Sequence, residues 1–369
     1  MSSFLFLTWD GGGNVPPAVG IAAELHRRGH AVRFLGHEGN RPAMAAATMP
    51  FRAFDHALPF TSRVVNGPER MVEVFNDAGV ARDLLIEADR EPTEVVVIDP
   101  LMLAALAAAH GSGLTYVPLV HLFYSYLRDA WLRAPFGQVA EQRGYAPYDA
   151  LDDAPLTLVA SLAALDPAAR ADLPGNAVHC GPVLACPAPR DLRTLPPTLL
   201  ISLSTYNFPG QTEGMQTLLD AAAELPARVI VTTGPVIKRT DLRLPDGIEV
   251  HDYLDHDTVM PHATAVLTHG GHATTMRALA HGLPLAVMPM HPMLDQPLVG
   301  KAVQEAGAGR LLQRDARPRE IRTVLEELLA DGAHRAAAAR LARLIRETDG
   351  TTTAKDRLEE LLTRAPASA

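Results

Sequence analysis

Short apolar segments alternate with longer helical patterns along the chain, and this alternation restricts the fold more than any other feature. In the N-terminal half, apolar runs predict strands at residues 4–9, 31–35, 95–98 and 114–120. Helical spacing of apolar residues predicts helices at 17–28 and 101–110. Strands that are apolar on both faces and joined by helices form parallel sheets covered on each side. This half therefore predicts a doubly wound α/β domain.

The pattern stops at a proline-rich segment and then starts again. Residues 185–197, ACPAPRDLRTLPP, have no period and are typical of a semi-rigid linker. Beyond it, strands are predicted at 198–203, 228–232, 248–253, 265–268 and 285–288, and helices at 211–224, 274–281, 296–306, 317–329, 333–348 and 353–362. A chain of 369 residues has room for two domains of about 150 residues each. We predict two doubly wound, Rossmann-like domains that face each other across a cleft.

Composition narrows the class of protein further. The net charge of −9 argues against a nucleic-acid partner, because such proteins usually carry a basic face. Two cysteines, Cys180 and Cys186, are too few for a disulfide framework or a cysteine metal site. The N-terminus has no signal-peptide pattern, and apolar runs such as 101–110 are shorter than the roughly 20 residues of a membrane span. We expect a cytoplasmic protein without a membrane span, and the sequence leaves a homodimer open.

The strongest site signal is the segment AVLTHGGHATTMRALAHGLPLAVMPMHPMLDQP, residues 265–297. His269 closes a predicted strand, and Gly270 and Gly271 would let a ligand approach the backbone. Thr274 and Thr275 come at the start of the next helix, where free N–H groups and the helix dipole favour phosphate. These residues predict a diphosphate site that needs no metal. The alternative is that Thr274 only caps the helix and His269 is an ordinary loop residue.

Asp295 and Gln296 follow the next strand along the chain. A carboxylate beside an amide suits vicinal sugar hydroxyls, because the first accepts hydrogen bonds and the second both accepts and donates them. An Asp-Gln pair alone is a common surface dipeptide. Its place after a strand next to the phosphate loop makes it a candidate sugar site.

These motifs resemble the GT-B nucleotide-sugar glycosyltransferases of family 1, in particular the bacterial members that glycosylate natural products. The resemblance extends from 265–297 to further segments at 15–36, 177–183, 199–207, 229–235 and 250–263. It covers both halves, the second more firmly. It implies an inverting, metal-independent transfer of a hexose or deoxyhexose from a UDP- or dTDP-sugar to a hydrophobic small-molecule acceptor. No cofactor is implied beyond the sugar donor itself.

The resemblance also implies roles for the parts of the chain. Residues 1–184 would bind the acceptor, 185–197 would be the linker, 198–352 would bind the donor, and a helix within 353–369 would cross back to the first domain. The donor residues would be His269, Gly270, Gly271, Thr274 and Thr275 at the diphosphate, Asp295 and Gln296 at the sugar, Tyr253 and Leu254 at the base, and Ser204 and Thr205 along the donor side.

The glycine-rich loop TWDGGGNVPP, residues 8–17, looks at first like a phosphate cradle. Pro16 and Pro17 argue against this, because proline lacks the N–H that a phosphate needs. In the family that the chain resembles, this loop faces the acceptor. We therefore expect Gly12 and Gly13 to form part of an acceptor wall, and plain turn chemistry is the alternative.

A less regular region at 121–155 contains aromatic residues that look exposed in the sequence. Two residues of this region, His121 and Tyr124, are further acceptor-binding candidates. Packing of the aromatic side chains into the core is the alternative.

The chain departs from the family pattern at the catalytic base. The family's base, a histidine in a GHxxP pattern, aligns with Asn14, and an asparagine cannot take up a proton at neutral pH. We hypothesise that Asp99 acts as the base, directly or through water, with Asp10 second and His121 third. In the alternative readings Asp99 is a turn residue or helix cap and His121 packs in the core. A phenolic or aromatic acceptor would tolerate a weak base, so O- and C-glycosylation both stay open.

Two other functions are compatible with parts of this pattern. A catalytically silent GT-B helper for a partner glycosyltransferase would explain Asn14, although it would have less reason to keep His269 and the Asp-Gln pair. A Rossmann dehydrogenase is disfavoured, because GGGN is not the G-x-G-x-x-G fingerprint. The sequence favours the glycosyltransferase.

Overall fold

The computed structural model describes residues 1–171, 173–330 and 332–364, which form two compact units. Unit 1 consists of residues 1–62, 66–184 and the chain from Thr348 onward, and unit 2 of residues 63–65 and 185–347. Each unit is built on one parallel β-sheet with helices packed against it. The predicted α/β class with two doubly wound domains is confirmed.

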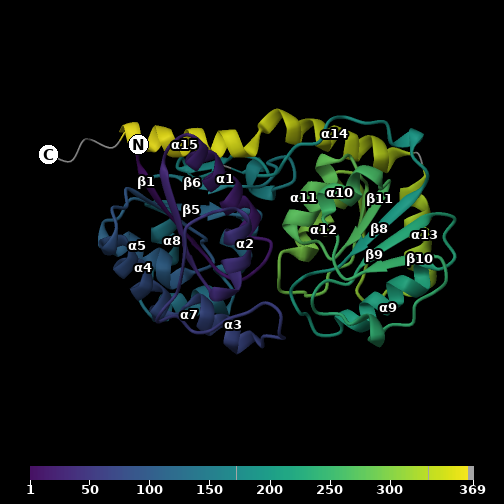
Figure 1. Ribbon diagram of the computed structural model, residues 1–369, viewed down its shortest axis with the longest axis horizontal. Coiled ribbons are helices and arrows are strands. Elements are labelled where there is room, and N and C mark those ends of the chain that lie inside the picture. The colour runs from purple at the N-terminus through teal and green to yellow at the C-terminus, as the bar shows by residue number, and fades with distance from the viewer. Residues whose placement is uncertain (172, 331, 365–369) are drawn as a thin grey trace. The chain divides into compact units, whose positions relative to one another are not determined.

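Unit 1 contains a seven-stranded parallel sheet in the order β3-β2-β1-β4-β5-β6-β7. Strands β1, β5 and β6 are labelled in Figure 1. Its strands are β1 (Ser3–Thr8), β2 (Ala31–Gly36), β3 (Phe51–Ala53), β4 (Val95–Ile98), β5 (Tyr116–Val120), β6 (Thr157–Val159) and β7 (Ala177–His179). The central strands are buried along their whole length, as expected for a parallel sheet covered on both faces. Burial on both faces of the sheet explains why these strands are apolar runs in the sequence.

The helices of unit 1 come from both ends of the chain. They are α1 (Val15–Arg27), α2 (Arg41–Ala46), α3 (Pro68–Phe75), α4 (Ala78–Arg90), α5 (Leu103–Ser112), α6 (Tyr124–Tyr126), α7 (Pro135–Gln142), α8 (Pro147–Asp152) and α15 (Gly350–Arg364). Helices α1 and α15 lie side by side (Figure 1), and both contribute to one core cluster with strands β1, β2, β4 and β5. The last helix of the chain therefore completes the core of the first unit.

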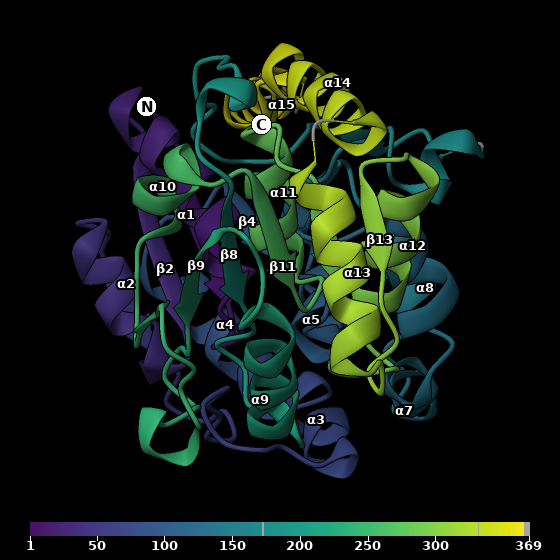
Figure 2. The same cartoon turned by 90° about the vertical axis from the view of Figure 1, so that its right-hand side faces the viewer.

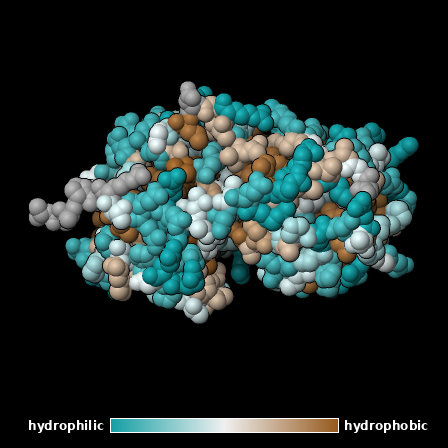
Figure 3. Space-filling model, turned by 90° about the horizontal axis from the view of Figure 1, so that it is seen from above, coloured by the Kyte–Doolittle hydropathy of each residue, from teal (hydrophilic) through white to brown (hydrophobic). Residues whose placement is uncertain are grey.

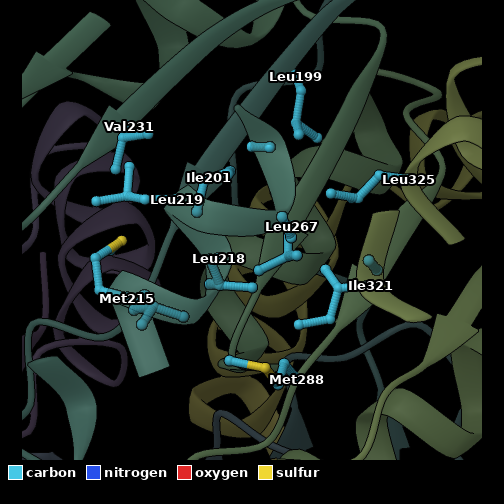
Figure 4. Close-up of a cluster of buried hydrophobic side chains, with 14 of the residues drawn as sticks. Leu199, Ile201, Met215, Leu218, Leu219, Val231, Leu267, Met288, Ile321 and Leu325 are labelled. Carbon is cyan, nitrogen blue, oxygen red and sulfur yellow. The ribbon is translucent and has the colours of Figure 1, made fainter. Parts of the chain in front are cut away.

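Unit 2 contains a six-stranded parallel sheet in the order β10-β9-β8-β11-β12-β13. Strands β9, β8 and β11 are labelled in Figure 2 in this order. Its strands are β8 (Thr198–Ser202), β9 (Arg228–Thr232), β10 (Ile248–His251), β11 (Ala265–Thr268), β12 (Leu285–Val287) and β13 (Gly309–Leu311). Its helices are α9 (Gln211–Ala222), α10 (His256–Val259), α11 (His272–Ala280), α12 (Gln296–Glu305), α13 (Pro318–Leu329) and α14 (Ala333–Thr348). Strands β8, β9 and β11 pack against α9 and α13 through the buried apolar side chains drawn in Figure 4.

The strand orders locate the edges where ligands bind. In unit 1 the order reverses between β1 and β4, and in unit 2 between β8 and β11. In open parallel sheets, ligands bind beyond the carboxyl ends of the strands at such a reversal. We therefore expect binding residues directly after β1, β4, β8 and β11.

Some predicted elements differ from the structure. Helix α11 begins at His272, two residues earlier than predicted, because Gly271 ends the extended backbone and serves as the N-cap. The sequence patterns did not reveal α4, β6 or β7, whose apolar runs are short or interrupted by charged residues.

In the part of the chain that is described, no helix has both the length and the apolar character to cross a bilayer. Hydrophilic residues cover much of the face seen in Figure 3, with apolar residues in small patches among them.

Candidate functional site

Three side chains meet at the carboxyl edge of the unit 1 sheet, where the strand order reverses. Asp99 follows β4 and is 6% exposed. Its Oδ2 accepts a hydrogen bond from Trp9 Nε1 at 2.8 Å and one from Asn14 Nδ2 at 3.0 Å. Its Oδ1 accepts a third from the Leu101 backbone N–H at 3.1 Å. The structure thus brings Asn14 and Asp99 together, and Trp9, which the sequence did not single out, joins them.

Asn14 is held in one orientation. Its Nδ2 also donates to Thr8 Oγ1 at 2.9 Å and to the Trp9 carbonyl oxygen at 3.1 Å, whereas its Oδ1 is buried and has no hydrogen-bond partner among the described residues. A flipped amide would place Oδ1 against the Asp99 carboxylate, which is unfavourable. A small pocket lined by Thr8, Asn14, Asp99 and neighbouring apolar residues adjoins the network. Asn14 is therefore a hydrogen-bond donor to Asp99.

The glycine-rich loop after β1 has a structural explanation. A Cβ on Gly11 would lie 2.5 Å from the Trp9 ring, closer than side-chain carbons approach one another. Gly12 has a φ of +81°, in the left-handed region that favours glycine. The bare backbone lets the loop wrap around the indole, so that Nε1 reaches Asp99. Turn chemistry, the alternative reading, accounts for Gly12, and packing against Trp9 accounts for Gly11. The acceptor wall with Gly12 and Gly13 stays a prediction.

His121 follows β5 and faces the same carboxylate. Its Nδ1 lies 3.4 Å from Asp99 Oδ2, longer than an ordinary hydrogen bond, and the side chain is 12% exposed. Burial lowers the pKa of His121 below its usual value, and the charge of Asp99 opposes this shift. The ring is thus held neutral beside a carboxylate.

Two other predicted residues of unit 1 lie apart from this network. A Cβ on Gly39 would lie 2.3 Å from Asp10 Oδ2, so the Asp10 side chain packs over the loop after β2, on the opposite side of β1 from β4. Tyr124 is 2% exposed, and its backbone N–H donates to Asp166 Oδ2 at 2.7 Å. The expectation of exposed aromatics at 121–155 is wrong for several of them: Phe123, Tyr124, Tyr126 and Trp131 are buried. These rings pack in the core.

In unit 2, His269 follows β11 at the reversal of strand order. Its side chain is buried, and burial lowers its pKa to about 4, so the ring is neutral at pH 7. The imidazole lies against Gly271, where a Cβ would be 2.5 Å from Nε2. Gly270 has a φ of +91°, and a Cβ there would be 2.8 Å from Val287. The two glycines are required by the packing of this loop.

The N-terminus of α11 differs in detail from the prediction. Its first residue is His272, which is buried, and the backbone N–H of Thr275 already donates to the Gly271 carbonyl oxygen. The N–H groups left for an anion therefore come before Thr275, at the start of the first turn. The Thr275 hydroxyl is itself buried and has no hydrogen-bond partner among the described residues, whereas Thr274 is partly exposed.

Asp295 and Gln296 lie at the start of α12. Burial raises the pKa of Asp295 to about 7, and its Oδ2 lies 4.0 Å from His272 Nδ1. Gln296 Oε1 accepts hydrogen bonds from the backbone N–H groups of Met290 and His291, at 2.7 and 3.0 Å. The amide oxygen of Gln296 therefore holds the preceding loop, and its Nε2 is the part left for a ligand. His272 is the site residue here that the sequence did not suggest.

The remaining predicted donor residues lie after β8 and β10. Ser204 is buried, and its Oγ accepts a hydrogen bond from the Tyr206 backbone N–H at 2.9 Å. Thr205 is exposed, Leu254 is partly buried, and Tyr253 is 76% exposed. The exposed ring of Tyr253 makes a large apolar surface available at this edge.

A buried polar chain runs along the same edge. Thr232 Oγ1 donates to Ser202 Oγ at 2.8 Å, and Ser202 lies 3.1 Å from His256 Nε2. Their positions at the ends of β8 and β9 and the start of α10 are the signal that could have found them in the sequence.

Among the described residues, no group of three or more His, Cys, Asp and Glu side chains is arranged to hold a metal ion.

Comparison with known proteins places this geometry in context. Residues 216–360 match the family described as erythromycin biosynthesis protein CIII-like, C-terminal domain. A rhamnosyltransferase of PGL/p-HBAD biosynthesis from Mycobacterium bovis (strain BCG / Pasteur 1173P2) is 36% identical over 46% of this chain and 38% of its own length. The match thus spans well under half the length of that curated relative.

Two solved structures match along almost the whole chain. The calicheamicin glycosyltransferase CalG4 is 25% identical with a TM-score of 0.81 and covers 100% of both chains. The spinosyn rhamnosyltransferase SpnG, complexed with thymidine diphosphate, is 19% identical with a TM-score of 0.72 over 98% of this chain and 100% of its own. Over its whole length the chain is therefore similar to a solved glycosyltransferase, and it has the GT-B fold.

Proposed function

We propose that the protein is an inverting glycosyltransferase that transfers a hexose or deoxyhexose from a UDP- or dTDP-sugar to a hydrophobic small-molecule acceptor. The observation that carries the proposal is the edge of the unit 2 sheet, where His269, the start of α11 and Asp295 follow neighbouring strands. The named relatives support it, since one is a rhamnosyltransferase and the SpnG structure was solved with thymidine diphosphate. The acceptor would be a natural product, for example a phenolic or aromatic one, and the bond formed would be O- or C-glycosidic.

The proposed donor site would hold the diphosphate without a metal or a cofactor. The N–H groups at the start of α11 and the positive end of its dipole would face the phosphate oxygens. Neutral His269 would donate one hydrogen bond from its ring rather than supply a charge. Leaving-group charge that develops on the diphosphate during transfer would be stabilised by the same donors.

Asp295 and Gln296 would bind the sugar. Asp295 must be ionised to accept hydrogen bonds from two hydroxyl groups, and Gln296 Nε2 would donate to a third sugar oxygen. Tyr253 and Leu254 would contact the base, and Ser204 and Thr205 would lie along the donor. A cytoplasmic location and a homodimer belong to this proposal as expectations.

The silent helper is not favoured, because the named relatives are themselves glycosyltransferases. Titration with dTDP and UDP, followed by thermal unfolding, separates the two. We expect a saturable rise in the unfolding temperature with at least one nucleotide. His269→Gln should weaken that binding about tenfold or more, which corresponds to about 1.4 kcal/mol.

His262→Gln, at an exposed histidine in the same unit, is the matched control and should bind as the wild type does. Mass spectrometry of phenolic acceptors incubated with dTDP- and UDP-sugars then tests transfer itself. Nucleotide binding that His269→Gln leaves unchanged, or no sugar transferred from any donor, would overturn the proposal.

A further inference from the structure

His121 and Asp99 form an imidazole–carboxylate pair at the edge of the unit 1 sheet. They follow β5 and β4, which are adjacent strands. His121 Nδ1 is buried, has no hydrogen-bond partner among the described residues, and lies 3.4 Å from Asp99 Oδ2. The side chain is nevertheless 12% exposed, and Nε2 is not among its buried atoms. The accessible part of the ring is therefore on its Nε2 side.

We propose that His121 is the general base of the transfer and that Asp99 is a positioning residue for it. The proposal rests on the proposed function and adds the group that takes the proton from the acceptor. A carboxylate beside Nδ1 favours the tautomer with the proton on Nδ1, which leaves the Nε2 lone pair free. The proposed base, His121, therefore follows β5, whereas Asn14 is on the loop after β1.

The other candidates are less suited by their contacts. Asn14 is fixed as a donor to Asp99 and has no basic atom. Asp99 is 6% exposed, and its two oxygens already accept hydrogen bonds from three donors. Little of this carboxylate is left to face an acceptor hydroxyl. Asp10 lies against Gly39, on the other side of β1.

The proton and electron balance of the step is simple for a hydroxyl acceptor. The acceptor O–H proton moves to His121 Nε2, and the oxygen lone pair forms the bond to the anomeric carbon of the sugar. The bond from that carbon to the diphosphate breaks, and its electron pair leaves with the diphosphate. The imidazolium that forms is stabilised by the negative charge of Asp99, and its proton is then lost to solvent.

The charges around His121 are consistent with a neutral ring at the start of the reaction. Burial lowers its pKa, and Asp99 is the charged group that acts against this. The other titratable groups near this edge are engaged elsewhere: Asp166 and His179 contact each other at 2.9 Å, and Asp10 lies over the loop after β2. An acid limb in the pH profile should therefore report the His121–Asp99 pair.

The test is the pH dependence of kcat/KM for a series of phenols of increasing acidity, with the sugar donor that the wild type uses. We expect His121→Gln to lower kcat/KM by about 10²- to 10⁴-fold and to remove the acid limb. The loss should shrink as the phenol becomes more acidic, because an ionised acceptor needs no base. Asp99→Asn should retain more activity than His121→Gln and move the acid limb to lower pH.

His110→Gln, on α5 of the same unit, is the control and should match the wild type. The proposal is overturned if His121→Gln stays within threefold of wild type while Asp99→Asn is inactive. A second measurement needs no acceptor: ¹⁵N NMR should show the His121 ring with its proton on Nδ1, and a proton mainly on Nε2 overturns the proposal. If the wild type transfers no sugar at all, the proposed function fails, and the NMR result still decides whether Asp99 holds the His121 proton on Nδ1.

Discussion

The glycines that follow β1 determine where the indole ring of Trp9 lies. Gly11 leaves room for the ring of Trp9, and Gly12 turns the chain back with a left-handed backbone. The result is a Trp9 Nε1 donor placed 2.8 Å from Asp99, in a site that is almost closed to water. A hydrogen bond from an uncharged donor to a buried carboxylate contributes more than one at the surface. The glycines thus matter for how Asp99 is held.

Gly11→Ala tests this role. The added Cβ would overlap the Trp9 ring, so the ring must move and its hydrogen bond to Asp99 is lost. We expect a loss of about 1–3 kcal/mol of unfolding free energy and a change in tryptophan emission. Gly111→Ala, in α5, where a Cβ meets nothing within 4 Å, is the control and should raise stability by about 0.5–1 kcal/mol. Wild-type stability and emission in Gly11→Ala would contradict the assignment.

At the scale of elements, the sequence predicted the central strands and most long helices, because their apolar patterns have one period and few interruptions. It placed Asp99, His121 and His269 directly after strands, and the structure agrees. It did not predict that Trp9 reaches Asp99, because that contact depends on the order of β1 and β4 in the sheet. Nor did it predict the burial of Tyr124, whose backbone is bound by the distant Asp166. Contacts between segments far apart in the chain leave no local pattern.

Helix α12 begins at a carboxylate whose pKa is raised. Asp295 is the N-cap of α12, but its side chain makes no capping hydrogen bond, and burial raises its pKa to about 7 from an ordinary value of 3.8. Because the folded pKa is the higher one, this group contributes stability at low pH, and the contribution is lost as pH rises through about 7. The apo protein therefore loses stability through Asp295 as pH rises from 3.8 to about 7, and the proposed sugar site needs the ionised form.

Asp295→Asn should therefore be more stable than the wild type at pH 8, by a margin on the order of a few kcal/mol, and close to it at pH 4. Urea unfolding of the apo protein, followed by circular dichroism at the two pH values, measures the difference. Asp246→Asn, which removes an exposed carboxylate from the same unit, is the matched control. A constant difference for Asp295→Asn would show that burial does not raise its pKa.

On the scale of the whole molecule, the core of unit 1 is built from two parts of the chain that lie before and after unit 2 in the sequence. Unit 1 begins at the N-terminus, yet its core cluster includes Ala354 and Leu358 of α15, which follows all of unit 2. Both tryptophans of the chain, Trp9 and Trp131, belong to unit 1. Tryptophan emission therefore reports the folding of unit 1 alone, whereas circular dichroism reports both units. The two signals can be compared in one sample.

Leu358→Ala removes a fully buried side chain that packs in the same cluster as Ile21 and Leu25 of α1. We expect a loss of about 2–5 kcal/mol, seen as an earlier transition in tryptophan emission. Leu267→Ala, a fully buried residue of the unit 2 core, should move the circular dichroism transition and leave the emission midpoint in place. Because α15 follows unit 2 in the chain, unit 1 cannot complete its core before unit 2 has been synthesised. If emission and circular dichroism shift together in both variants, the two cores unfold as one cooperative unit.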